Sequence, residues 1–299
     1  MTLRHRKLDV TITLGPTTSA STPTVTSRPT FAEGGNTVTL TNHRASANIK
    51  MVGGASMPQA QIRIYGMTLS LMNQLSTLGR VRLAAMNNTI SVSAGNDEDG
   101  MGVVFSGTIT QAWADFKGSP DVPFHIVAQS GMAAALQIIP PSSFTGSADV
   151  ATIMSGLATQ MGYTFENNGV TAKLASPYFP GTALQQAQAC AQAAGIEMVI
   201  ENNVLAIMPR GVARGSRAVL ISPSTGMVGY PAFTGNGIAI QAEFNPSVTF
   251  HSLIKVESDL TPANGQWRVI NMMHDLDAQT PGGAWFSFLE CTEPSNAFR

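Results

Sequence analysis

The sequence predicts a mainly β protein with an α+β part: two similar antiparallel, barrel-like β units that flank a small α+β module. Three observations lead to this prediction. Apolar and polar residues alternate, as in half-buried strands, in the first 130 residues and again after residue 210. Between about 131 and 209, Ala and Gln become frequent and apolar residues recur at helical spacing.

The third observation is a hairpin pattern that occurs twice. A strand at 105–115 is followed by a Gly/Pro loop and by a return strand at 122–128. When the chain is shifted by 162 positions, Phe105 falls on Trp267, Asp115 on Asp277 and Phe124 on Phe286. A pattern repeated in this way indicates one β unit that is used twice.

Residues 1–130 are expected to form the first β domain. Its expected strands lie at 8–14, 37–42, 47–52, 61–65, 81–86, 89–94 and 101–114, and 15–30 reads as an extended loop. One helix is expected at about 68–78, because Thr68 can cap it and Gly79 can end it. Asn96–Gly100 is expected to be a hairpin turn.

Residues 131–209 are expected to form the α+β domain. One helix would begin at a Ser147 cap and end at Gly162, and a second would run from a Thr182 cap to Gly195. A strand pair is expected around 163–165 and 170–174, and a hairpin at 196–208.

Residues 210–299 are expected to form the second β domain. A strand ends at Glu257, and a long strand follows the turn 261–265. Asn264 and Gly265 are expected to supply the positive φ of a tight hairpin. Within the long strand, His274 is expected to face the opposite side from Asp275 and Asp277.

The surface is predicted to lie largely in interfaces between proteins. Charged residues make up only 12% of the chain, about half of the usual ~25%. Interface cores are depleted in charge and enriched in Met, of which this chain has 15. A net charge of −1, without a large basic block, argues against sequence-specific binding of duplex DNA.

The remaining composition points to a protein without disulfides, metal or membrane spans. Cys190 and Cys291 are too far apart for a metal motif, so reduced, buried thiols are expected. No apolar run approaches 18 residues, and the alternating Leu8–Leu14 segment reads as a strand and not as a signal peptide.

No catalytic, cofactor-binding or metal-ligating residues are predicted. Asn96–Gly100 resembles a calcium loop only superficially, and a solvated hairpin tip is favoured. Asp115 and Asp277 occupy equivalent slots, which favours a repeated turn role over an acid/base pair. The other histidines, His5, His43, His125 and His251, stand alone in the sequence.

The order of several segments resembles phage baseplate central hub proteins of the contractile-tail type, related to late control protein D and VgrG-like hubs. Thr37–Leu40 through Arg44–Ala47, Ile62–Met67, Met72–Ser76 and Phe105–Ile109 look like the N-terminal tube domain of that family. Segments 140–146 and 184–195, followed by the hairpin into 208–211, are similar to its middle domain, and 265–276 with 281–286 to its C-terminal tube domain.

The resemblance implies a structural protein of the virion and not an enzyme. Such a hub is a homotrimer whose two tube domains per chain match the hexameric tail tube on one side, while the other side accepts the trimeric central spike. It encloses a channel for DNA and tape measure protein, which pass through it transiently, and it can contact other baseplate proteins. It is assembled in the host cytoplasm and resides in the tail baseplate, without insertion into a membrane.

Two further expectations follow from the resemblance. Because the chain ends at Arg299, soon after the second β unit, the spike is expected to be a separate protein. Uncharged or acidic groups are expected to face the channel, since a basic wall would hold passing DNA by its phosphates.

Two other functions remain open from the sequence. A tail-associated cell-wall hydrolase would clear peptidoglycan on a zymogram. A receptor- or carbohydrate-binding tail module would bind host cells alone, through loops with exposed aromatic residues. Only 7% of the residues are aromatic, and Trp113, Trp267 and Trp285 lie in strands or at strand starts, where core packing is expected.

Overall fold

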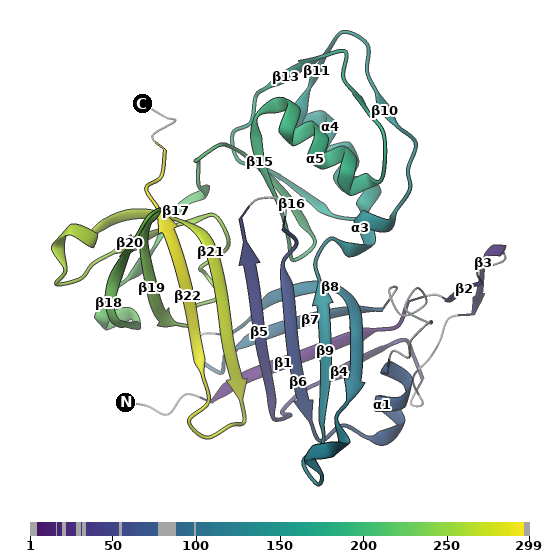
Figure 1. The fold of residues 1–299 in the computed structure, drawn as a ribbon, viewed down its shortest axis with the longest axis vertical. Helices are drawn as coiled ribbons and strands as arrows, with labels where there is room; N and C mark the ends of the chain where they lie inside the picture. The colour runs from purple at the N-terminus through teal and green to yellow at the C-terminus, as the bar shows by residue number, and fades with distance from the viewer. Residues whose placement is uncertain are drawn as a thin grey trace. The chain divides into compact units, whose positions relative to one another are not determined.

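A computed structural model describes most of the chain (Figure 1). The described residues are 5–15, 17–19, 22–27, 31, 34–53, 56–76, 88–98 and 100–295. The expected strand at 81–86 and the helix stop at Gly79 lie outside them. The mainly β class with antiparallel pairing is confirmed, and the described strands trace an open path and not a closed barrel.

The chain forms two compact units. Unit 1 consists of Met1–Lys50, Gln59–Ser130 and His274–Phe286, and unit 2 of Met51–Pro58, Gly131–Met273 and Ser287–Arg299. The division into domains at 130 and 209 remains a prediction, because the two units cut the chain in another way.

Unit 1 is built on one antiparallel sheet. In spatial order its strands are β5 (Ala45–Val52), β6 (Gln59–Tyr65), β9 (Pro123–Gln129), β8 (Gly100–Ala114), β7 (Thr89–Asn96), β1 (Arg6–Thr13) and β4 (Thr37–Leu40). Beside β5, this unit also holds the His274–Ala278 end of β21 (Gly265–Ala278). In the segment expected to be a loop, β2 (Thr17–Ser19) and β3 (Thr22–Ser27) pair with each other.

The sheet of unit 1 folds into two layers because β8 belongs to both. Gly100–Thr108 pairs with β7, and Thr108–Ala114 pairs with β9. The register shifts near Val103 and Thr110, and such bulges allow a strand to bend. Figure 1 shows β1 and β7 crossing behind β5, β6 and β9. Between the layers lie the fully buried side chains of Ile12, Ile49, Ile62, Ile64, Ile90, Phe105, Phe124 and Ile126.

One helix follows β6. α1 (Leu69–Leu75) begins at Thr68, whose side chain accepts a hydrogen bond from the Leu71 N–H, as expected for this cap. Met72 and Leu75 are its buried residues. The helix ends at Leu75 and not at about 78.

The α+β module lies in unit 2. Its helices are α3 (Met132–Leu136), α4 (Val150–Met161) and α5 (Ala183–Ala194). Its strands are β10 (Ser142–Ser143), β11 (Ser147–Asp149), β12 (Thr164–Asn167), β13 (Lys173–Ala175), β14 (Tyr178–Phe179), β15 (Ile196–Glu201) and β16 (Val204–Pro209). The two long helices pack on the β12–β16–β15 sheet through a core that includes Val150, Met154, Leu157, Ala187, Cys190, Leu205 and Ile207.

Most helix boundaries of this module agree with the sequence. Thr182 caps α5 with a full capping box, and Gly162 and Gly195 end the two long helices in the left-handed conformation. The cap of α4 is Asp149 and not Ser147, because the Asp149 carboxylate accepts the Thr152 N–H. The expected strand pair is also wrong: β12 pairs with β16, and β13 pairs with β11.

The last six strands are β17 (Arg214–Ile221), β18 (Met227–Thr234), β19 (Gly237–Glu243), β20 (Ser252–Val256), β21 and β22 (Trp285–Thr292). The turn before β21 differs from the expected tight hairpin. Thr261–Ala263 form a 3-10 turn, and Asn264 has a φ of −71°, so that only Gly265 takes a positive φ. The Asn264 side chain instead holds the Ser258 backbone through two hydrogen bonds.

Two sets of six strands have the same order. The first set is β1, β5, β6, β7, β8 and β9, and the second set is β17 to β22. When each set is numbered from one to six along the chain, its neighbours run 1-4-5-6-3-2. The sets differ in direction at one equivalent pair, because β1 and β7 are antiparallel, whereas β17 and β20 are parallel. The 162-residue shift places β8 on β21 and β9 on β22, which hold the same positions in the two sets.

Close packing at the start of β19 generates the first prediction. Gly237 has a φ of +145°, and a Cβ there would lie 2.4 Å from the Cys291 carbonyl oxygen. We expect Gly237→Ala to lower the free energy of unfolding by about 2–4 kcal/mol, since the overlap adds to the strained φ. Urea unfolding checks this value. Gly235→Ala is the control, because nothing lies within 4 Å of a Cβ there, and a change as large as that of Gly237→Ala would contradict the steric argument.

Candidate functional site

The calcium-like segment is a hairpin tip. Asn96 pairs with Gly100 across β7 and β8, and the Asn96 side chain accepts the Glu98 N–H at 2.8 Å. Asp97 pairs with Lys7 on β1. These contacts match the expected solvated turn, although Asp99 is outside the described residues.

The carboxylates of the two hairpins have turn roles, as the sequence predicts. The Asp115 side chain accepts the Lys117 N–H at 3.0 Å, and the Asp277 side chain accepts the Ala284 N–H at 2.9 Å. Along β21, His274 is buried and Asp275 and Asp277 are half-buried, in the expected alternation. Burial lowers the pKa of His274 to about 4, so it is neutral at pH 7.

The cysteines are inert in character. Cys190 and Cys291 are both buried and unpaired with each other. Burial raises the pKa of the Cys190 thiol to about 11 and that of Cys291 to about 12, which suppresses the reactive thiolate. Within the described ranges, no group of three or more His, Cys, Asp or Glu residues could hold a metal ion, and no helix is long and apolar enough to cross a membrane.

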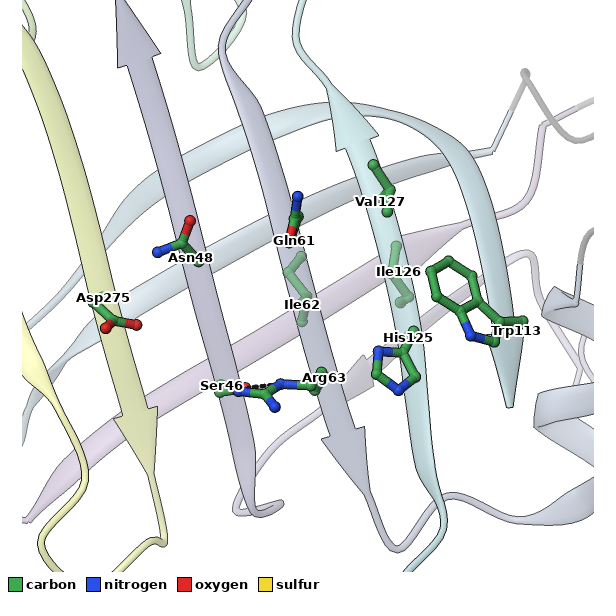
Figure 2. A pocket seen from close by; sticks show the side chains of 10 residues that line it. All are labelled: Ser46, Asn48, Gln61, Ile62, Arg63, Trp113, His125, Ile126, Val127 and Asp275. Carbon is green, nitrogen blue, oxygen red and sulfur yellow. Dashed lines mark hydrogen bonds between the residues drawn. The ribbon is translucent and has the colours of Figure 1, made fainter. Parts of the chain in front are cut away.

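The strongest candidate surface is a polar groove on the outer face of the unit 1 sheet (Figure 2). It has a volume of about 320 Å³ and crosses the neighbouring strands β21, β5, β6, β9 and β8. Its lining residues are Ser46, Asn48, Gln61, Ile62, Arg63, Trp113, His125, Ile126, Val127 and Asp275. Gln61 and Arg63 point to this face because they alternate along β6, whereas the side chains of Ile62 and Ile126 are buried on the opposite face.

The groove has one aromatic end. Trp113 stacks on His125 with ring centroids 5.0 Å apart and planes 6° apart. Burial, with a smaller effect of nearby Arg63, lowers the pKa of His125, so the histidine is uncharged against the indole at pH 7. Arg63 donates its Nε–H to the Ser46 hydroxyl at 3.0 Å. The groove therefore offers hydrogen-bonding groups with little charge.

The expected core packing of the tryptophans is confirmed for two of the three residues. Trp267 and Trp285 are buried, but Trp113 is 42% exposed. Ala112 is buried, so its neighbour Trp113 points to the opposite face of the strand. The size and hydrophobicity of tryptophan alone favour a core position.

Unit 2 contains a partly buried charge network that the sequence did not predict. Arg214, the first residue of β17, donates to both Glu166 oxygens at 2.8–3.1 Å and also pairs with Glu201. Arg268 on β21 pairs with Glu197 and contacts His251 Nδ1 at 2.7 Å. The carboxylates belong to the α+β module and the arginines to the β strands, so the network joins these two parts of unit 2.

The network shifts the pKa values of its members. The hydrogen bond from Arg214 lowers the pKa of the Glu166 carboxyl, whereas burial raises that of Glu201 although Arg214 opposes the shift. Burial, aided by Arg268, lowers the pKa of His251 to about 3, which keeps the ring neutral beside the guanidinium. The sequence offered one signal for this network: Glu197 and Glu201 stand in the apolar hairpin 196–208, in a chain that has few charged residues.

This network generates the second prediction. We expect Glu201→Ala to lower the free energy of unfolding by about 3–5 kcal/mol, because it leaves part of a buried guanidinium unpaired. Glu257→Ala is the control: Glu257 pairs with Lys255 at 2.7 Å, but both side chains are about half exposed, and we expect a loss of about 0–1 kcal/mol. Thermal unfolding of both variants checks the difference, and equal losses would show that burial of the network is unimportant.

Comparison with known proteins places this chain among phage tail components. The sequence profile described as baseplate hub gp41 matches residues 28–281. A search of the curated proteins found no match. The fold is shared with a 43 kDa tail protein of prophage MuSo2 from Shewanella oneidensis, at 9% identity and a TM-score of 0.60 over 86% of this chain and 94% of that one.

Two further solved structures have the same fold. A tail protein from Neisseria meningitidis has 11% identity and a TM-score of 0.60, with 97% of each chain covered. A type VI secretion component of E. coli, described as structurally similar to the T4 tail proteins gp27 and gp5, has 10% identity and a TM-score of 0.59 over 85% of this chain and 74% of that one. Since the family profile matches well over half of the sequence, the chain belongs to the baseplate hub gp41 family and is a structural component of a phage tail baseplate.

Proposed function

We propose that three copies of this chain form a hub that joins a hexameric tail tube to a trimeric central spike, in a baseplate of the contractile type. The observation that carries the proposal is the repeated strand order 1-4-5-6-3-2 of the two six-strand sets. In this reading each set is one tube-type β domain, and the α+β module between them in the chain is the middle domain.

The repeated strand set supports a change from the sixfold symmetry of the tail tube to the threefold symmetry of the spike. Three chains with two similar sets present six similar sheets, which fit the six subunits of a tube ring. The sets differ in detail, so the other side of the same ring has only threefold symmetry, as a trimeric spike requires. Closed rings are the usual outcome when identical subunits join through one repeated contact.

The groove face supports a channel for DNA and tape measure protein. Arg63 and Asp275 are the oppositely charged residues among its lining side chains, and the others are uncharged at pH 7 or apolar. If this face of the sheet lines the channel, passing DNA meets no basic wall to which its phosphates would bind. The partners are then the tube protein, the spike protein and the tape measure protein, with no enzymatic step required of the hub.

Solution mass gives the third prediction. We expect light scattering of the purified chain to yield a mass close to three times the 31.4 kDa of one chain. Addition of the spike protein is expected to shift the whole trimer to a larger complex. A monomer at every concentration, both with and without the spike protein, would contradict the proposal.

One observation favours a second candidate function, a carbohydrate-binding tail module. An exposed indole beside polar side chains is the kind of platform on which a sugar ring can stack, and Trp113 lies at such a place in the groove. For this function we expect the purified chain to bind host cells or their glycans, and Trp113→Ala to reduce that binding at least tenfold. Absence of binding by the wild-type chain would exclude this candidate and leave the hub unaffected.

A further inference from the structure

A row of four side chains crosses the groove of unit 1 from strand to strand. The register of β5, β6, β9 and β8 sets the order of this row, which is Ser46, Arg63, His125 and Trp113. Residues that pair directly on one face of a sheet have Cβ atoms about 4.5–5.5 Å apart. A hydroxyl, a guanidinium, an imidazole and an indole therefore follow one another in a single line.

The indole end of the row is a flat platform. Figure 2 looks onto the outer face of the sheet and shows the rings of Trp113 and His125 face-on, and their planes differ by only 6°. Trp113 is 42% exposed. An exposed aromatic face beside polar groups suits a ligand with one apolar face and a polar rim, such as a sugar ring.

Arg63 supplies the positive charge of the row. It donates its Nε–H to the Ser46 hydroxyl at 3.0 Å, which fixes the orientation of the guanidinium. The side chain is exposed, so its terminal N–H groups can reach a ligand in the groove. A planar guanidinium fits a carboxylate best, because the two groups form two parallel hydrogen bonds.

The distance between these two groups sets the size of the ligand. β9 lies between β6 and β8. Because neighbouring strands are 4.7–4.9 Å apart, the backbones at Arg63 and Trp113 are about 10 Å apart. A single sugar ring is too short to pack on the indole and reach the guanidinium, so the ligand needs at least two linked rings.

The remaining polar side chains of the groove suit hydroxyl groups. Asn48 and Gln61 pair across β5 and β6 in the next row, and their amides can both donate and accept hydrogen bonds. Asp275 lies on β21, on the other side of β5 from Arg63, and its carboxylate can accept hydrogen bonds from hydroxyls. It also repels a second anionic group, which disfavours a polyanion such as DNA.

We infer that the groove binds an acidic oligosaccharide, in which one sugar ring packs on Trp113 and the carboxylate of a neighbouring sugar accepts two hydrogen bonds from Arg63. This inference rests on the second candidate function, carbohydrate binding, and specifies its ligand. An acidic peptide would also satisfy Arg63, but it offers no ring of hydroxyl groups to Asn48, Gln61 and Asp275.

A glycan array tests the chemical class of the ligand. It carries oligosaccharides that contain uronic or sialic acids, each beside its methyl ester, and it is probed with the purified full chain. We expect at least one acid to bind, and its ester to bind about tenfold more weakly, because esterification removes the charge and leaves the rings unchanged. Equal binding of acid and ester would overturn the role of the carboxylate alone, whereas binding of no glycan would overturn carbohydrate binding as well.

Variants separate the roles of the two groups, and calorimetry with the tightest-binding acid and its ester measures them. We expect Arg63→Gln to weaken binding of the acid about tenfold and to leave binding of the ester unchanged, because only the acid uses the guanidinium. Arg63→Lys is expected to recover part of the loss, since a lysine keeps the charge but not the planar fork. Trp113→Ala is expected to weaken binding of both ligands.

The matched control is Arg217→Gln, which removes an exposed arginine of β17 in unit 2. We expect this control to bind like the wild type, and circular dichroism checks that all variants fold. A loss in Arg63→Gln no larger than that in Arg217→Gln would contradict the assigned role of Arg63. Binding of a poly-glutamate peptide as tightly as the best glycan would show that the groove recognises carboxylates without a sugar, and would overturn the inference.

Discussion

The backbone N–H and C=O groups along both edges of each strand need hydrogen-bond partners, and this requirement governs the structure. An open edge exposes N–H and C=O groups that either pair with the correct strand or invite aggregation. In unit 1 the edge of β5 is closed by the end of β21. The long strand β8 changes layers near Thr108, because it pairs with β7 up to that residue and with β9 from that residue onward. The two-layer core and the extended groove face follow from this requirement.

The second constraint is the scarcity of charge. Only 12% of the residues are charged, yet five charged groups of unit 2 lie in one partly buried network. Buried ion pairs give little net stability but penalise any arrangement that separates them. Arg214 and Arg268 can satisfy Glu166, Glu201 and Glu197 only when the α+β module is docked on its β strands. The network therefore selects one arrangement within unit 2.

The sequence predicted what depends on local patterns. Strand alternation, the Thr182 cap and the turn roles of Asp115 and Asp277 all follow from residue type and spacing. The sequence could not predict which distant strands pair, because β12 has the same alternation whether it pairs with β13, which follows it in the chain, or with β16. The exposure of Trp113 was missed for a similar reason: whether a strand face is covered depends on distant segments.

Trp113 in the first strand set and Asp275 in the second occupy equivalent positions, and this difference has a consequence for docking. In a six-part ring these residues would alternate, so an indole and a carboxylate would follow each other at steps of 60°. A threefold-symmetric partner that binds the three tryptophans would face three aspartates if it were rotated by 60°, so the rotated orientation would be disfavoured. In the hub that we propose, this difference between the two strand sets would fix the rotational orientation of a threefold partner on the axis, whereas a sixfold partner that contacts only backbone edges would not distinguish the two orientations.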